Sequence, residues 1–219
     1  MSLSLEKSKA WHKESIAKRA IEYLNKNHID AYYVETADAA CKKILELIPL
    51  NSKVGYGGSL TLHEIGIKDL LRNKNYNFID RDLPEIDDDK IYSLRRKSLL
   101  ADVFLMSTNA LTLGGQLVNI DGVGNRVAAL IFGPSKIIVV AGINKIVPDI
   151  EAAIYRIKNY VAPIHAKRRN RKLPCAQSGY CMNCHAPERF CNALVVIEHQ
   201  YLKNKDRIVV IIVGQELGL

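Results

Sequence analysis

Short apolar runs alternate with longer amphipathic stretches along most of the chain. The runs have the length and composition of β-strands; they begin at Ala31, Ser52, Tyr76, Asp102, Gly115, Lys136, Ala193 and Arg207. The amphipathic stretches carry apolar residues at helical spacing; they cover residues 5–28, 36–49, 61–73, 91–100, 124–132 and 148–161. The run "KIIVVAG" from Lys136 is the clearest buried strand, because it is continuous and rich in β-branched residues.

This alternation predicts the fold class. Strands that alternate with helices favour a mainly parallel sheet with helices on both faces, which is a Rossmann-like α/β fold. We expect a single domain over residues 1–219, long enough to bury a substantial core. A basic, cysteine-rich segment at residues 165–192 has little helical or strand character and is inserted before the last strands.

Composition and charge exclude several classes of protein. Hydrophobic residues make up 48% of the chain and charged residues 25%, as in folded globular proteins. No apolar run approaches the ~20 residues of a membrane span, and the charged N-terminus does not resemble a signal peptide, so we expect a cytoplasmic location. The net charge is +8, with its densest block in "HAKRRNRK" from His165. Because no aromatic residues interleave with this block, it argues against nucleic-acid binding.

The glycine-rich stretch "GYGGSLTLHEIG" from Gly55 lies where a strand is expected to turn into a helix. Glycines let a ligand approach the backbone, and hydroxyls at a helix start favour an anion. We therefore assign Gly57, Gly58, Ser59 and Thr61 to an anion-binding turn, although a tight turn alone explains the glycines equally well. Glu64 is either a general base beside the anion or the capping-box partner of Thr61.

Two further polar loops follow predicted strands. "NIDGVGNRVA" carries Asp121, Asn125 and Arg126, and "AGINKIV" carries Asn144 and Lys145. The carboxyl ends of parallel strands lie at one edge of a sheet, so these loops and the glycine turn should share a crevice. Arg126 and Lys145 would hold a small anionic metabolite, and Asp121 is the second candidate for a catalytic base. The alternative is that Asp121 and Arg126 pair only to fix a turn.

Four of the five cysteines are clustered with the spacing C-x5-C-x2-C-x6-C. In a reducing compartment such a cluster binds metal more often than it forms disulfides. Cys175, Cys181, Cys184 and Cys191 suit either a [4Fe–4S] cluster, which we favour, or Zn²⁺. The fifth, Cys41, lies alone in a helical pattern and is expected in the core.

Several stretches resemble the LUD domain family of lactate-utilisation proteins. They are "GYGGSLTLHEIG", "STNALTLGGQLVNIDGVGNRVAALIFGP", "VVAGINKIV" and "IHAKRRNRKLPC". The resemblance implies a fold like that of ribose-phosphate isomerases, glucosamine-phosphate deaminases and CoA transferases, with an anion-binding turn at Gly57–Thr61. It also implies a place in an iron–sulfur system that oxidises L-lactate to pyruvate.

The pattern and the resemblance together suggest a LUD-domain protein of lactate or organic-acid metabolism. It would combine an anion site with a four-cysteine metal centre and could transfer electrons with iron–sulfur partner subunits. One alternative is an isomerase-type enzyme that acts on a phosphorylated small molecule and has a structural metal. Another is a non-catalytic regulator that binds a metabolite. Catalysis and homo-oligomerisation are left open by the sequence.

Overall fold

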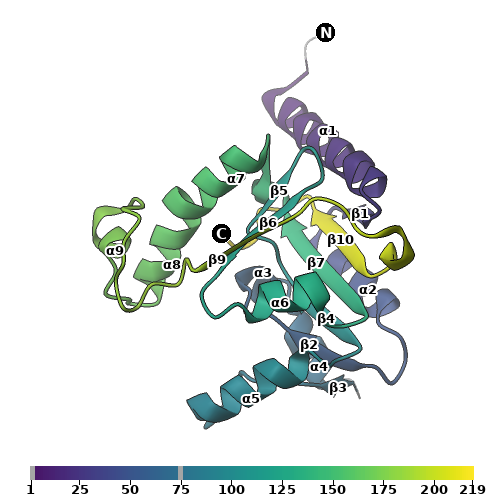
Figure 1. The fold of residues 1–219 in the computed structure, drawn as a ribbon. Coiled ribbons are helices and arrows are strands. Elements are labelled where there is room, and N and C mark those ends of the chain that lie inside the picture. Colours follow the sequence, from purple (N-terminus) through teal and green to yellow (C-terminus); the bar gives the residue numbers. More distant parts are fainter. Residues whose placement is uncertain (1–2, 74–75) are drawn as a thin grey trace.

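A six-stranded parallel sheet forms the centre of the molecule in the computed structural model, which describes residues 3–73 and 76–219 (Figure 1). Residues 1–2 and 74–75 of the predicted domain lie outside this description. The strand order is β1-β10-β7-β4-β2-β3, and every neighbouring pair is parallel. The strands are β1 (Asp30–Val34), β2 (Lys53–Tyr56), β3 (Asn77–Phe78), β4 (Val103–Met106), β7 (Lys136–Gly142) and β10 (Ile208–Val213).

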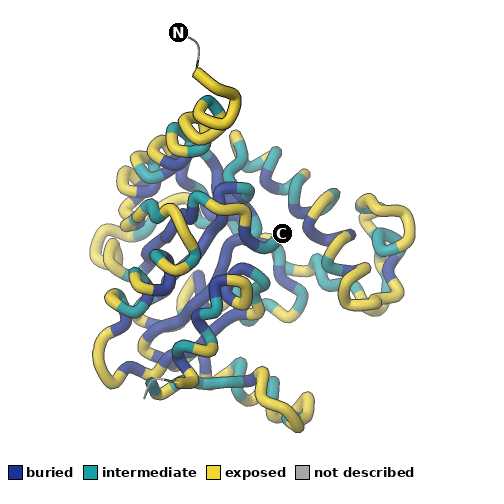
Figure 2. Tube along the Cα trace, turned by 180° about the vertical axis from the view of Figure 1, so that it is seen from behind, coloured by how far each residue is buried: buried dark blue, intermediate teal, exposed yellow. Residues whose placement is uncertain are grey.

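The two central strands have the continuous apolar sequences that a doubly covered sheet requires. Every residue of β10 is buried, and in β7 only Lys136 is partly exposed. Seen from behind, the strands form the buried interior, and the exposed positions lie on the surrounding helices and loops (Figure 2). The predicted fold class, a mainly parallel sheet with helices on both faces, is confirmed.

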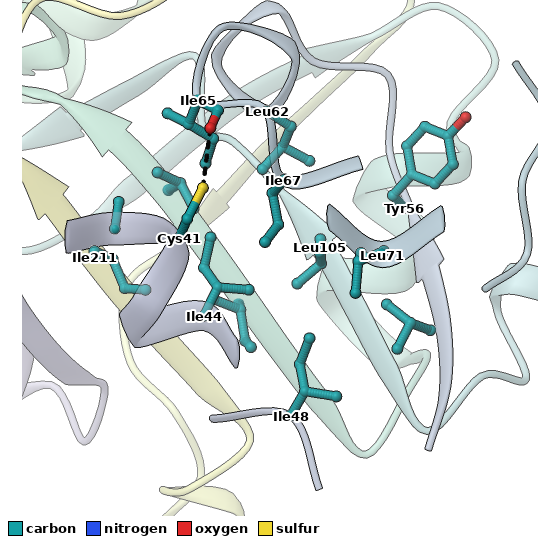
Figure 3. Packing of buried hydrophobic residues seen from close by; sticks show 14 of the residues in the cluster. Cys41, Ile44, Ile48, Tyr56, Leu62, Ile65, Ile67, Leu71, Leu105 and Ile211 are labelled. Carbon is teal, nitrogen blue, oxygen red and sulfur yellow. Dashed lines mark hydrogen bonds between the residues drawn. The ribbon is translucent and has the colours of Figure 1, made fainter. Parts of the chain in front are cut away.

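Helices cover both faces because alternate strand residues point to opposite sides. One core contains residues of α2 (Ala37–Leu47), α3 (Leu60–Glu64) and α4 (Ile67–Asn73), packed on the sheet. Within it, the Cys41 thiol donates a 2.9 Å hydrogen bond to the carbonyl of Ile65 (Figure 3). Burial raises the pKa of Cys41 to about 11, as expected for a core thiol.

The opposite face carries more varied structure. Its core contains residues of α1 (Leu5–Lys26) and α6 (Asn125–Phe132), and α5 (Asp88–Ser98) packs against β2 through the contact of Ser98 with Gly55. The remaining cover is a second sheet, which the sequence pattern did not predict. It has the order β8-β5-β6-β9, with β5 (Ala110–Thr112), β6 (Leu117–Asp121), β8 (Ile146–Val147) and β9 (Ala193–Ile197).

After β8 the chain forms a long helical arm, before it returns to the second sheet as β9. It comprises α7 (Ile150–Arg156), the π-helical turn η2 (Ile157–Val161) and α8 (Ala162–Arg168). The sequence predicted this helix from Pro148, but the N-cap is Asp149, whose side chain accepts a 2.8 Å hydrogen bond from the Ala152 amide. The cysteine segment follows, beginning with α9 (Pro174–Ser178) at the far end of the arm (Figure 1).

Two short 3-10 turns complete the description. The 3-10 turn η1 (Ile143–Lys145) connects β7 to β8, and η3 (Leu202–Asn204) lies between β9 and β10. Within the described ranges, none of the helices has the length and apolar character needed to cross a membrane.

The buried position of β10 leads to a stability prediction. Ile211→Ala should lower the free energy of unfolding by about 2–5 kcal/mol, because it removes fully buried methyl groups and leaves a cavity. The matched control is Ile131→Ala on α6, where the side chain is 54% exposed, and it should change stability by less than about 0.5 kcal/mol. Urea unfolding of the two variants measures both; equal losses would contradict the placement of β10 in the core.

Candidate functional site at the carboxyl edge of the parallel sheet

Four connections meet at the carboxyl edge of the central sheet, where ligands bind in open α/β folds. Each begins where a strand of the sheet ends; they are residues 57–59 after β2, 107–109 after β4, 143–145 after β7 and 214–218 after β10. The first and third of these were predicted from the sequence. The second and fourth supply further polar groups at the same edge.

Lys145 is the central residue of this edge. Its side chain is buried, with 4% exposed, and its Nζ donates to Thr61 Oγ1 at 2.8 Å and to Ser107 Oγ at 2.9 Å. A third hydrogen bond, 3.3 Å long, reaches the carbonyl of Thr108. Within residues 3–73 and 76–219, Lys145 forms no ion pair with a carboxylate. The amine is thus surrounded by neutral oxygens.

The ionisation of Lys145 follows from this environment. Burial, helped by the charges of Arg156 and Arg126, lowers the pKa of Lys145 to about 7. An amine in this state is poised to exchange a proton near neutral pH, a capacity that general acids and bases require. Arg156 was not identified from the sequence; it is held by the backbone carbonyls of Asn109 at 3.0 Å and Asn144 at 3.2 Å.

Helix α3 begins differently from the capping box considered above. Its N-cap is Ser59, whose hydroxyl accepts a 3.2 Å hydrogen bond from the Leu62 amide. Thr61 lies inside the helix, fully buried, and turns its hydroxyl toward Lys145. The capping-box interpretation of Thr61 and Glu64 is therefore wrong. Glu64 instead accepts a 2.6 Å hydrogen bond from the backbone amide of Gly218.

The segment Gln215–Gly218 packs over Lys145. Leu217 is buried, and its amide donates a 3.0 Å hydrogen bond to Asn144 Oδ1. Gly218 has a left-handed backbone with φ of +62°, and a Cβ there would lie 2.6 Å from Thr61 Oγ1 and 3.3 Å from Lys145 Nζ. A side chain at this position would therefore collide with the polar cluster, so the close approach requires glycine.

Asp121 and Arg126 form a buried pair near this cluster, but Asp121 ends β6 of the second sheet and does not follow a strand of the parallel sheet, as had been predicted. Asp121 Oδ1 lies 2.7 Å from Arg126 Nε, and Oδ2 accepts a 2.9 Å hydrogen bond from the Arg126 amide. The guanidinium also donates to the Ser107 carbonyl at 3.1 Å and to Asn109 Oδ1 at 3.0 Å. Both groups are thus occupied by protein partners. To act as a base or to bind a ligand, as predicted from the sequence, either would have to leave these partners.

The glycine turn has two distinct sides. On one side, Gly57 packs on Arg126: a Cβ on Gly57 would lie 2.6 Å from Arg126 Cγ. The backbone amide of Gly57 donates a 2.9 Å hydrogen bond to the Leu105 carbonyl. This amide is used within the protein and is not free for a ligand. Gly58 is exposed, and a Cβ there would lie 3.1 Å from Arg81 Nη2. A ligand would therefore meet the turn on the side of Gly58 and Arg81.

The structure thus brings part of the predicted site together. Lys145 contacts Thr61 directly. Glu64 and Asn144 both bind the segment Gln215–Gly218 that covers them. Asn125 opens α6 beside the Asp121–Arg126 pair. Ser107 was not predicted, although it comes at the end of a predicted strand, as Lys145 does.

The cysteine segment is fastened to the end of the helical arm. His165 of α8 contacts Phe190 edge-on, with ring centroids 5.3 Å apart, and the Cys181 amide donates to Asn159 Oδ1 at 3.3 Å. Arg189 holds two backbone carbonyls of the segment, donating to Cys184 at 2.6 Å and to Cys191 at 3.1 Å. These contacts order a stretch that has little regular structure of its own.

The four thiols of the segment are free and partly buried. They are close enough to affect one another: burial and then Cys184 raise the pKa of Cys175, while burial and the other three thiols raise the pKa of Cys191 to about 11. A bound cation would relieve this mutual repulsion, so the donor set suits a soft metal centre. In the described part of the chain, however, no three His, Cys, Asp or Glu side chains are grouped as metal ligands.

The chain has a mainly parallel α/β fold, a class in which ligands commonly bind at strand ends. A family model described as "LUD domain" matches residues 17–213. The chain therefore belongs to the LUD domain family.

One solved structure supports the fold. The crystal structure of a DUF162 family protein from Deinococcus radiodurans is 15% identical in sequence, with a TM-score of 0.52. The match covers 92% of this chain and 98% of that chain. No curated protein matches the chain.

The lowered pKa of Lys145 predicts a specific pH dependence of stability. Between about pH 7 and the ordinary value of 10.5, the unfolded chain holds one more proton than the folded chain. Stability relative to Lys145→Met should therefore rise with pH above 7, by roughly 1 kcal/mol per pH unit. Urea unfolding at pH 6, 7, 8 and 9 measures this slope. For the exposed control Lys203→Met, the difference in unfolding free energy from the unmodified protein should not change with pH. If the difference for Lys145→Met were also independent of pH, the buried amine would be contradicted.

Proposed function

We propose that this LUD-domain protein binds a small organic-acid anion at the carboxyl edge of its central sheet, with Lys145 as the residue that recognises its charge. The observation that supports this proposal is a buried amine bonded only to neutral oxygens of Thr61, Ser107 and Thr108. A ligand carboxylate would provide the negative partner that these groups do not.

The chemistry of the pocket is well matched to a carboxylate. Thr61 and Ser107 each carry a hydroxyl that can donate a hydrogen bond to an anion, and protonated Lys145 adds a full charge. Arg126 and Arg156 lie behind the amine and raise the positive potential without leaving their protein partners. Binding of an anion would favour the protonated amine and so raise the pKa of Lys145.

Access to this pocket requires a movement of the segment Gln215–Gly218. Opening would break the hydrogen bonds of Leu217 with Asn144 and of Gly218 with Glu64. It would also break those that Gln215 makes with the backbone amides of Ala37 and Ile143, and would withdraw Leu217 from the core. Glu64 then has a role that does not involve proton transfer: it fastens the closed segment. Opening the segment would free Glu64 and Asn144 to face the ligand.

We further propose that Cys175, Cys181, Cys184 and Cys191 bind a metal centre, with a [4Fe–4S] cluster favoured over Zn²⁺. The four free, mutually interacting thiols support it, and the amide of Asn183 already donates a 3.4 Å hydrogen bond to Cys181 Sγ. A cluster would supply one-electron chemistry, which suits a role in organic-acid oxidation with iron–sulfur partner subunits.

Ligand binding tests the first proposal. Pyruvate and L-lactate, titrated by calorimetry at pH 6.5, should bind the unmodified protein, and Lys145→Met should weaken binding about tenfold or more, since it removes a charged hydrogen bond. Affinity should also fall as the pH rises through 7, because the amine loses its proton. Lys203→Met, on the exposed surface, is the matched control. Unchanged affinity in Lys145→Met would rule out charge recognition by this residue.

Metal analysis tests the second proposal. Protein purified without oxygen should contain iron and acid-labile sulfide in equal amounts and absorb visible light, or contain zinc alone if the centre is Zn²⁺. The double variant Cys181→Ser, Cys184→Ser should lose the metal because the two-residue chelating pair is gone. Cys41→Ala, which changes a core thiol, should retain it. Protein containing neither iron nor zinc under these conditions would contradict the proposal.

A further inference from the structure

Arg81, which follows β3, is a buried cation that forms no ion pair among the described residues. Its side chain is 9% exposed, and its guanidinium carbon lies 5.0 Å from the centroid of the Tyr56 ring. Among residues 3–73 and 76–219, Arg81 forms no ion pair, although the Tyr56 side chain and the charge of Asp82 favour its charged form. Because an arginine remains protonated in proteins, it cannot relieve its burial by losing the charge.

The carboxylates next to Arg81 are already occupied. Asp80 accepts a 2.6 Å bond from Arg72 Nε, and Asp82 accepts one of the same length from Lys68 Nζ. Asp80 is also bonded to the Tyr56 hydroxyl at 3.2 Å. The two acidic neighbours of Arg81 in sequence are thus paired with other cations, and the guanidinium is left without a carboxylate partner.

Arg95 of α5 adds a second positive charge to the same place. Burial lowers the pKa of Arg81, and the charge of Arg95 lowers it further. The guanidinium of Arg95 lies 5.0 Å from the centroid of the Tyr92 ring, and its Nε is buried without a hydrogen-bond partner among the described residues. The two arginines repel each other, and their closest support comes from the rings of Tyr56 and Tyr92 and, for Arg81, from the charge of Asp82.

The glycine turn brings Arg81 to the ligand edge. Its Nη2 lies 3.1 Å from the position that a Cβ on Gly58 would occupy, so the guanidinium rests against the backbone of the exposed turn. On the other side of the turn, Gly57 packs on Arg126, next to the Lys145 pocket. The strand order places β2 and β4 between β3 and β7, so Arg81 and Lys145 approach the turn from opposite sides.

Unpaired buried charges are costly unless a ligand compensates them. Two guanidiniums offer several donors in fixed planes, the arrangement that recognises a phosphate by paired hydrogen bonds. A doubly charged phosphate also matches two cations better than a carboxylate does. The Ser59 hydroxyl, at the end of the turn, can donate one more hydrogen bond.

We propose that Arg81 and Arg95, with the turn at Gly58 and Ser59, form a phosphate-binding subsite. If the proposed function of Lys145 holds, the substrate class becomes a phosphorylated organic acid or carbonyl compound, with its phosphate at Arg81 and its other polar end at Lys145. The phosphate subsite itself does not depend on Lys145.

Inorganic phosphate is the probe that tests this subsite. Titrated by calorimetry and followed by thermal unfolding, it should bind and stabilise the unmodified protein, whereas acetate should do so far less. Arg81→Gln should weaken phosphate binding about tenfold or more. Without phosphate, the same variant should be at least as stable as the unmodified protein, because it removes an uncompensated buried charge. A residue that only supported the fold would show the opposite effect on stability.

Two matched variants show whether phosphate binds at Arg81 or elsewhere on the basic surface. Arg96→Gln changes an exposed arginine of the same helix as Arg95 and should keep phosphate affinity within about twofold of the unmodified protein. Lys145→Met should also retain binding of inorganic phosphate, even if it loses pyruvate. Equal affinity in Arg81→Gln and Arg96→Gln, or no phosphate binding by the unmodified protein, would overturn the proposal and leave the Lys145 site untouched.

Discussion

The buried pair of Asp121 and Arg126 joins the two sheets at the edge where the candidate site lies. Asp121 ends β6 of the second sheet, and Arg126 reaches the Ser107 carbonyl beyond β4 of the central sheet at 3.1 Å. The turn between Asp121 and Arg126 also contacts the cysteine segment, since a Cβ on Gly122 would lie 2.9 Å from Phe190 Cβ. Loss of one partner would leave a buried charge uncompensated. The pocket, the second sheet and the cysteine segment therefore share one structural support.

The central sheet was predictable because its strands are short, apolar and separated by amphipathic helices. This pattern is local and can be recognised in a single sequence. The second sheet was not predictable. It pairs β6 with β9 across more than seventy residues, and Ala193–Ile197 appears in the sequence as one of two similar final strands. Only the tertiary partner decides that this strand leaves the parallel sheet while Ile208–Val213 enters its centre.

The residues of the candidate site that follow strand ends could be predicted from the sequence. The side-chain partners of these residues could not. Lys145 and Thr61 were identified because both follow buried strands and parallel strands end at one edge. Asp121 and Arg126 were expected after a strand of the parallel sheet, but Asp121 ends β6 of the second sheet, and Arg126 reaches the edge through the Ser107 carbonyl. The sequence could not decide whether the two residues face a ligand or each other. Arg81 was missed because "DRD" is typical of a solvated loop, and burial of its middle residue depends on Tyr56.

The two buried cations of the edge differ in how they tolerate the absence of a ligand. Lys145 can release its proton near pH 7 and remain buried as a neutral amine bonded to hydroxyls. Arg81 has no such option, because its guanidinium stays charged at any physiological pH. The lysine pocket can therefore close under Gly218 at little electrostatic cost, while the arginine side remains in need of an anion. In the proposed binding mode, this asymmetry would let Arg81 and the exposed turn at Gly58 attract the ligand first, before the segment over Lys145 opens.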